Sequence, residues 1–152
     1  AEAYPVHNIT LNTYHATIQA AINEVEATTV TEATTFVINV APGEYVENLV
    51  INKITHTKSY EITGTAGTTL KGTVRVNSNS TYYDSTLLIN GIGFVDNTPA
   101  TGNAFIVFGN DGATRYASNI TIEDCTFTGT NQLDWGLEPI SASGVKNITI
   151  KN

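Results

Sequence analysis

Two short segments of the chain pair aromatic rings with carboxylates. Tyr82-Tyr83-Asp84 and Asp134-Trp135 each place a flat apolar ring beside an acidic group. Flat rings stack on sugars and carboxylates accept hydrogen bonds from sugar hydroxyls, so these segments indicate a surface that binds carbohydrate. The alternative interpretation is structural, because the only tryptophan of a small domain is usually well buried, and Tyr83 or Trp135 could cover the edge of a core.

Acidic residues elsewhere do not form the clusters that a metal ion needs. Glu123 and Asp124 are adjacent in an expected strand, so their side chains point to opposite faces and cannot ligate one ion together. Asp111 and Arg115 lie in a Gly/Asn-rich segment, where an exposed ion pair contributes less than about 1 kcal/mol. The three histidines are dispersed and lack metal-ligand spacing. The sequence therefore predicts no metal site and no cofactor.

The composition restricts the partners that the chain can bind. Its 152 residues carry a formal net charge of −7 and include only seven Lys and Arg, which are scattered. Nucleic acids and anionic membrane surfaces are bound through clustered Lys and Arg, so the sequence predicts neither as a partner. It also predicts no membrane insertion, since no run of about 18 apolar residues occurs. Cys125 is the only cysteine, which excludes an internal disulfide and is typical of a small buried residue.

One segment has the apolar spacing of a helix. Within residues 17–25, Ile18, Ala21, Ile22 and Val25 fall at i, i+3, i+4 and i+7, which predicts an amphipathic helix of about three turns. The Thr-rich stretch that follows is β-branched and opposes continuation of the helix. Short apolar segments come next and are expected to be strands, at residues 36–40, 45–51, 60–62, 70–76, 87–94, 105–108, 120–127 and 148–150.

The strand segments contain a weak internal repeat. Residues 87–94 align with residues 120–127 at an offset of 33, and residues 119–122 recur as residues 147–150 at an offset of 28. Recurrence at this period in an all-β chain indicates a solenoid, whose turns stack at roughly 4.8 Å. The stacking predicts one column of Ile89, Ile122 and Ile150, and a second column of Phe94 and Phe127.

The predicted fold is an all-β, right-handed parallel β-helix with an N-terminal capping α-helix. The helix would cover the apolar end and the unpaired strand edge of the first turn. Residues 14–152 form this domain and residues 1–13 an extension, and the last residues stand in mid-strand, so we expect the C-terminal end to be truncated or open. Left-handed or tightly bent corners are expected at Gly64, Gly91, Gly93, Gly129 and Asn97.

The N-terminus carries two features of an exported chain. Ala1-Glu2-Ala3-Tyr4 is interpreted as the mature end left after removal of a signal peptide, or as a short non-native remnant, and is left out of the fold prediction. Asn-X-Thr sequons, which could carry glycans in a secretory host, begin at Asn8, Asn79, Asn119 and Asn147. The expected location is secreted or at the cell surface.

The order of these motifs resembles the pectin lyase-like superfamily of right-handed parallel β-helices and is most similar to that of the pectin methylesterases. The resemblance covers the chain from about residue 14 onward. It is carried by residues 17–22, 36–38 and 42–51, which look like the capping helix and first turn of the family. These motifs imply the fold rather than an activity, because non-enzymatic β-helix proteins share them.

Later segments resemble the active-site region of the esterases. Residues 93–98 and 102–107 are similar to a segment whose glutamine helps to hold the oxyanion, and Asn103 stands at that position. Residues 125–132 resemble the next segment, which ends in a glutamine followed by an acidic aspartate, where this chain has Asn131-Gln132. The nucleophilic aspartate of the family would lie on a further turn, at or beyond the end of this chain.

The departure from the family pattern bears on catalysis. Ester hydrolysis of this type needs one carboxylate as nucleophile and a second as proton donor. An amide cannot carry the proton or form the acyl intermediate, and its presence costs many orders of magnitude in rate. Asp134 could take the place of the missing acidic aspartate only through a bulge that shifts the strand. Asp111 and Asp134 are therefore weak catalytic candidates, and the alternative places residues 131–134 in a polar corner loop.

The sequence thus favours a binding or structural module over an enzyme. We expect a surface or secreted β-helix that contacts a polysaccharide or cell-wall glycan, or that serves in adhesion. One alternative is a carbohydrate esterase of the pectin methylesterase type, or an N-terminal fragment of one. Another is a filament or oligomer subunit whose open end is covered by a second chain or by further turns. The candidate substrate-binding residues are Asn103, Asn131, Gln132, Trp135, Tyr82 and Tyr83.

Overall fold

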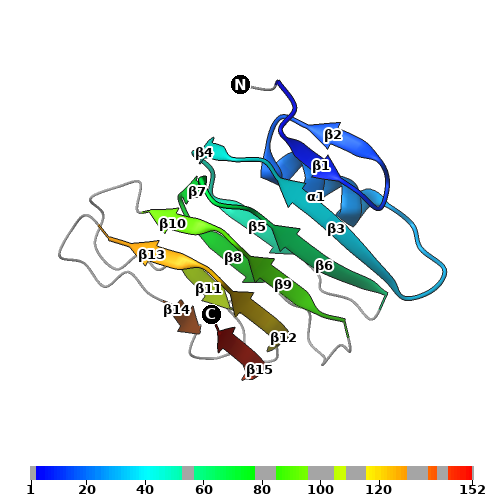
Figure 1. Ribbon diagram of the computed structural model, residues 1–152. Helices are drawn as coiled ribbons and strands as arrows, with labels where there is room; N and C mark the ends of the chain where they lie inside the picture. Colours follow the sequence, from blue (N-terminus) through cyan, green and yellow to red (C-terminus); the bar gives the residue numbers. More distant parts are fainter. Residues whose placement is uncertain are drawn as a thin grey trace.

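The computed structural model describes residues 3–52, 57–77, 85–95, 105–108, 116–129, 137–139 and 144–151. Over these residues the chain is mostly β-strand with a single α-helix, which confirms the predicted all-β class (Figure 1). The strands form three sheets. The one helix in the described part is too short and too polar to cross a membrane.

The largest sheet has seven strands in the order β15-β12-β9-β6-β3-β1-β2. The pairs from β3 to β15 are parallel, whereas β1 pairs antiparallel with both β2 and β3. Its strands are β1 (Val6–Asn8), β2 (Thr13–His15), β3 (Thr34–Val40), β6 (Lys58–Thr63), β9 (Leu87–Asn90), β12 (Tyr116–Glu123) and β15 (Gly144–Lys151).

The other two sheets have four parallel strands each. The first has the order β13-β10-β7-β4, and its strands are β4 (Gly43–Tyr45), β7 (Thr68–Lys71), β10 (Gly93–Val95) and β13 (Thr126–Thr128). The second has the order β14-β11-β8-β5, and its strands are β5 (Leu49–Asn52), β8 (Val74–Asn77), β11 (Ile106–Phe108) and β14 (Leu137–Pro139).

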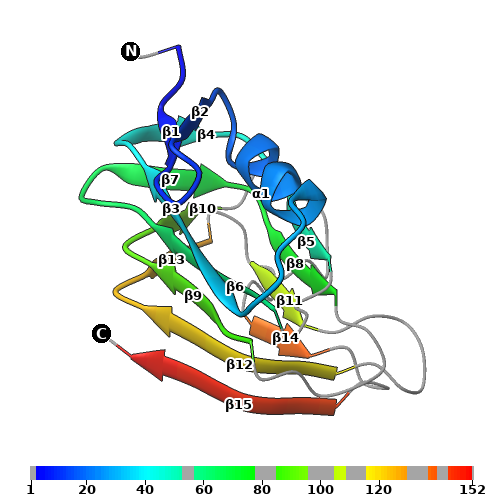
Figure 2. The ribbon, with the colours of Figure 1, turned by 90° about the vertical axis from the view of Figure 1, so that its right-hand side faces the viewer.

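From β3 onward the chain visits the three sheets in a fixed order. The strands β3, β6, β9 and β12 of the seven-stranded sheet are each followed by one strand of the β4 sheet and one of the β5 sheet, after which the chain returns (Figure 2). We call each such set of three strands a repeat. Neighbouring repeats pair in the register that the sequence offsets predict, because Leu87 lies beside Ile120 and Ile120 lies beside Ile148.

The predicted columns of apolar residues are confirmed, although they are not buried along their whole length. Ile89 pairs with Ile122 and Ile122 with Ile150, and the first two are buried while Ile150 is 59% exposed. The rings of Phe94 and Phe127 stack with centroids 5.1 Å apart, and Phe127 is 37% exposed. Ile150 and Phe127 are exposed because β15 and β13 are edge strands of their sheets.

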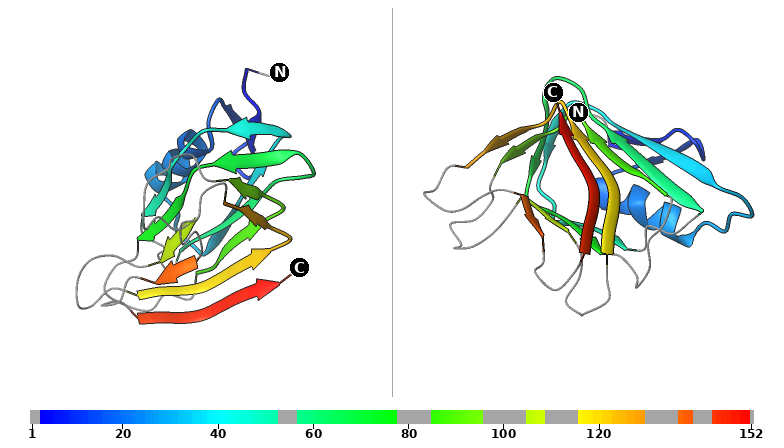
Figure 3. Two further views of the ribbon diagram at one scale, coloured as in Figure 1. Left: turned by 90° about the vertical axis from the view of Figure 1, so that its left-hand side faces the viewer. Right: turned by 90° about the horizontal axis from the view of Figure 1, so that it is seen from below.

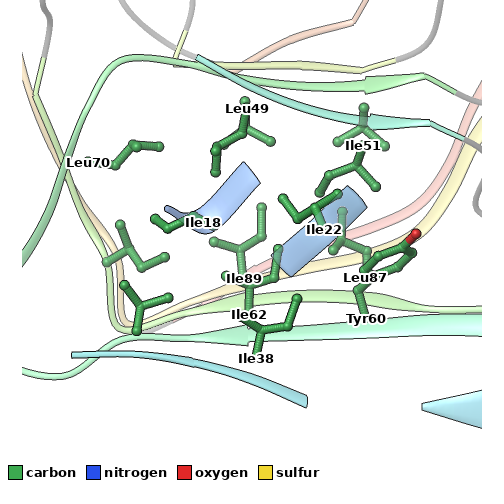
Figure 4. Packing of buried hydrophobic residues seen from close by; sticks show 14 of the residues in the cluster. Ile18, Ile22, Ile38, Leu49, Ile51, Tyr60, Ile62, Leu70, Leu87 and Ile89 are labelled. Atoms are coloured by element: carbon green, nitrogen blue, oxygen red, sulfur yellow. The ribbon is translucent and has the colours of Figure 1, made fainter. Parts of the chain in front are cut away.

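The three sheets and the helix face one hydrophobic core (Figure 3). Buried residues alternate with less buried ones along β6, β7, β8 and β9, as in Leu87–Asn90, where Leu87 and Ile89 are buried. Figure 4 shows Ile38, Ile62 and Ile89, which lie on successive strands, gathered beside the helical residues Ile18 and Ile22.

The single helix, α1 (Ile18–Ala27), lies where its periodicity predicts it. The four apolar residues Ile18, Ala21, Ile22 and Val25 are all buried. The Thr17 hydroxyl accepts a hydrogen bond from the Ala20 amide at 3.1 Å and so caps the first turn. The Glu47 carboxylate, from the segment between β4 and β5, accepts hydrogen bonds from the backbone amides of Ile18 and Gln19, each at 3.0 Å.

The helix α1 lies beside β5, an edge strand of its sheet (Figure 2), and its side chains form hydrogen bonds with the β5 backbone. The Gln19 amide donates to the Val50 carbonyl at 2.9 Å and accepts from the Val50 N–H at 2.7 Å. The Glu26 carboxylate accepts from the Asn52 N–H at 2.8 Å. These bonds replace the strand partner that β5 lacks on this side.

Several expected strands were wrong in extent because the chain turns from one sheet to the next inside them. Each of the segments 45–51, 70–76, 87–94 and 120–127 is divided between two sheets. At equivalent corners Gly91 has φ +71° and Asp124 has φ +52°, so a left-handed residue redirects the chain. The strands β1, β2 and β14 were not predicted at all.

The predicted corner glycines act in different ways. Gly91 adopts the left-handed conformation, as expected. Gly64 and Gly93 do not have positive φ, and Gly64 is required instead by close packing, since a Cβ there would lie 2.8 Å from the Gly91 carbonyl oxygen. Gly129 also lacks a positive φ, and Asn97 lies outside the described residues.

Candidate functional site

A hollow of about 350 Å³ opens on the outer surface where β1 and β2 join the seven-stranded sheet. Its walls combine aromatic rings with amide and hydroxyl groups. It is lined by Tyr4, Pro5, His7, Tyr14, Asn39, Val40, Ala41, Pro42, Thr63 and Thr65. Two of its rings face solvent, since Tyr4 is 61% exposed and Tyr14 is 58% exposed.

Strand pairing places the central residues of the hollow in one line. Tyr14 on β2 pairs with His7 on β1, His7 pairs with Asn39 on β3, and Asn39 pairs with Thr63 on β6. Cross-strand partners project from the same face of a sheet, so these side chains lie next to one another. The rings of His7 and Tyr14 stack with centroids 4.1 Å apart and planes within 7°.

A carboxylate on α1 holds the β1–β2 hairpin that carries these rings. One oxygen of Glu24 accepts hydrogen bonds from the Asn8 amide at 3.0 Å, from the His15 imidazole at 3.0 Å and from the Thr13 hydroxyl. Asn8 is fully buried, and its side-chain oxygen also accepts from the Leu11 amide. A glycan on the Asn8 sequon would therefore be incompatible with the folded hairpin.

The hydrogen bonds on Glu24 change its acidity. Burial raises the pKa of the Glu24 carboxyl, but the bonds from Thr13, His15 and Asn8 favour the ionised form and lower the pKa by more. The net result is a pKa below the ordinary value of 4.5. Glu24 is thus ionised at neutral pH and draws three strand side chains onto the helix.

The chemistry available in the hollow is that of binding. Exposed aromatic faces can stack on a flat apolar surface, while Asn39 and the hydroxyls of Thr63 and Thr65 can exchange hydrogen bonds with a ligand. Among the described residues that line the hollow there is no Asp or Glu. Within the described ranges no cluster of metal-ligating side chains occurs.

No site at this hollow was predicted from the sequence. The catalytic and substrate-binding candidates all lie outside the described residues: Tyr82, Tyr83, Asn103, Asp111, Asn131, Gln132, Asp134 and Trp135. Tyr4 and His7 were missed because residues 1–13 were set aside as an extension, and Tyr14 was missed because β2 was not predicted. The sequence contains no clear signal for these strands, because residues 6–8 and 13–15 are short and the connection between them contains Ile9 and Leu11.

Other residues weighed in the sequence have structural surroundings. Glu123 ends β12 and its carboxylate lies 3.7 Å from the Lys151 ammonium, while Asp124 stands at the following corner. Cys125 packs partly buried against the core, as expected of a small residue, and burial raises the pKa of its thiol.

Comparison of the chain with protein-family models, curated proteins and solved structures gave no match in any of the three.

Replacing Glu24 by glutamine should make the protein less stable at neutral pH, by about 1–2 kcal/mol, because the acceptor of the hairpin loses its charge. Since the folded pKa of Glu24 is lowered, its stabilisation is complete above about pH 4.5 and disappears as the pH falls through the lowered pKa. Urea unfolding at a series of pH values should therefore show that the difference in free energy of unfolding between wild type and Glu24→Gln becomes smaller in acid. Glu44→Gln, at an exposed position on β4, is the control. If the loss of unfolding free energy in Glu24→Gln did not depend on pH, the stabilising role of the ionised Glu24 carboxylate would be contradicted.

Proposed function

We propose that the chain is a right-handed parallel β-helix module that binds polysaccharide outside the cell. The β-helix is supported by the fixed order in which each repeat visits the three parallel sheets, and by the helix that covers the edge of β5. A solenoid of this kind presents long, regular outer faces, on which one ligand can contact several repeats.

The observation that carries the function is the hollow at the β1–β2 end of the seven-stranded sheet. The exposed ring of Tyr14 is held rigidly by stacking on His7, and the hairpin beneath it is fixed to α1 through Glu24. A rigid aromatic face beside Asn39 and Thr63 suits a sugar ring, whose faces are apolar and whose rim carries hydroxyls. The preorganised surface would lose little conformational entropy on binding.

The setting we propose is a secreted or cell-surface protein, in which the module contacts a cell-wall glycan or serves as part of an adhesin. The polar groups of the chain come mostly from Thr, Asn and Ser, and only 14% of its residues are charged. The pectin methylesterase alternative depends on Asn103, Asn131, Gln132 and Asp134, which lie outside the described residues, and it stays a prediction.

Substitution of Tyr14 tests the proposed function. Tyr14→Ala should lower the affinity for a polysaccharide identified on a glycan array by about tenfold, which corresponds to about 1.4 kcal/mol, because the stacking face is lost. Tyr14→Phe keeps the ring and should bind nearly as well as wild type. Val46→Ala removes exposed apolar surface elsewhere and serves as the control. Equal binding by Tyr14→Ala and wild type would contradict the placement of the site.

Self-association is a second candidate function, favoured by the apolar surface on the edge strands β13 and β15. Phe127 is 37% exposed and Ile150 is 59% exposed, although their partners Phe94 and Ile122 are buried. A second chain that added strands beside β15 and β13 would cover both ladders and these side chains.

Sedimentation at micromolar concentration distinguishes this candidate. Wild type should sediment as an oligomer, and Ile150→Lys should shift it toward the monomer by placing a charge in the contact. Val46→Lys, at another exposed apolar position, should leave the oligomer intact. A wild-type protein that sediments only as a monomer would overturn the self-association candidate and leave polysaccharide binding untouched.

A further inference from the structure

A row of outward side chains crosses the seven-stranded sheet with one residue from each strand. Every neighbour in the row is a cross-strand partner of the next. At a strand spacing of roughly 4.8 Å the row is about 29 Å long. From β2 to β15 its members are Tyr14, His7, Asn39, Thr63, Asn90, Glu123 and Lys151.

The row is outward-facing along its whole length because it alternates with core positions. The residues that precede Asn39, Thr63 and Asn90 are Ile38, Ile62 and Ile89, and all three isoleucines are buried. Thr63, Asn90 and Glu123 are each the last residue of their strand, so this part of the row runs along the corner where the seven-stranded sheet gives way to the β4 sheet.

A second hollow, of about 420 Å³, borders the row at this corner. It shares Thr65 with the aromatic hollow, so the two form adjoining depressions. Gly91 and Gly93 keep it open, since a Cβ on Gly93 would lie 3.1 Å from the Thr126 hydroxyl. Its lining is Thr65, Ala66, Gly67, Thr68, Thr69, Gly91, Ile92, Gly93, Asp124 and Thr126.

The middle of the row contains an unused hydrogen-bond acceptor. The side-chain oxygen of Asn90 is shielded from bulk water and accepts no hydrogen bond from any described residue. A buried acceptor without a donor is unfavourable, so Asn90 gains a hydrogen bond if its side chain turns toward the surface and meets a ligand hydroxyl there. Asn90 lies beside the second hollow, because Gly91 follows it in the chain.

The charges beside the row select against acidic ligands. Among the described residues, neither hollow is lined by Lys or Arg, and Asp124 lies in the second one. Lys151, at the far end of the row, is paired with Glu123 at 3.7 Å. A polymer of uronates, sulfates or phosphates would meet uncompensated negative charge, in a chain whose net charge is −7.

We propose that the ligand is a neutral linear polysaccharide that lies across the strands along this row. This inference rests on the proposed function and extends it. One sugar stacks on Tyr14 in the aromatic hollow, and the following units exchange hydrogen bonds with Asn39, Thr63 and Asn90 and then with the Thr-lined second hollow. Affinity therefore increases with the number of sugar units until the row is covered.

Calorimetric titration with neutral glucan and mannan oligosaccharides of increasing length tests the inference, with oligogalacturonates as the acidic comparison. Wild type should bind longer neutral oligosaccharides more tightly and oligogalacturonates more weakly. Thr126→Val, which removes a hydroxyl of the second hollow, should lower the affinity for long oligosaccharides by about threefold to tenfold and leave that for short ones unchanged. Thr128→Val, on the same strand and outside the hollow, is the matched control and should bind like wild type.

The outcomes separate this inference from the proposed function. Binding that requires Tyr14 but does not depend on length would overturn the extended row and leave the proposed function standing. Tighter binding of oligogalacturonates than of neutral chains would overturn the choice of ligand. Absence of binding to every glycan, neutral or acidic, would overturn both.

Discussion

The fold depends on parallel strand pairing that places apolar side chains of one repeat over those of the next. A single strand such as Leu87–Asn90 can bury Leu87 and Ile89 only if Tyr60 and Ile62 lie on one side and Ile120 and Ile122 on the other. The same register fixes the outer face, because alternation along a strand places one outward residue between two core residues, as Leu88 stands between Leu87 and Ile89. Core and outer row are therefore two consequences of one alignment.

Such an arrangement leaves edges that must be covered, and on the N-terminal side the β1–β2 hairpin covers β3 while side chains of α1 cover β5. The side chains of Gln19 and Glu26 on α1 accept hydrogen bonds from backbone N–H groups of β5, and Glu47 caps the start of the helix. Glu24 ties the β1–β2 hairpin to the other side of the helix. The hairpin that protects the end of the seven-stranded sheet thereby also carries the aromatic hollow, so the residues that stabilise this end also position the binding surface that we propose.

The apolar pattern was sufficient to predict the helix and the columns, because burial of Ile18, Ile22, Ile89 and Ile122 follows directly from spacing. It could not divide the segment at residues 87–94, since the corner at Gly91 depends on a single backbone angle. Nor could it find the aromatic hollow. Tyr14 and Asn39 are far apart in the chain and meet only through the antiparallel pairing of β1 with both neighbours.

The register of the repeats is most directly tested by cysteine pairs on the outer face, in a background with Cys125→Ala. Leu88 and Thr121 are direct partners on β9 and β12, so Leu88→Cys with Thr121→Cys should form an intramolecular disulfide under mild oxidation. Leu88→Cys with Thr149→Cys spans a further strand, a separation of roughly 10 Å that is too large to bridge. Mass spectrometry should find the bond in the first pair only; a bond in the second pair, or in neither, would contradict the stacked repeats.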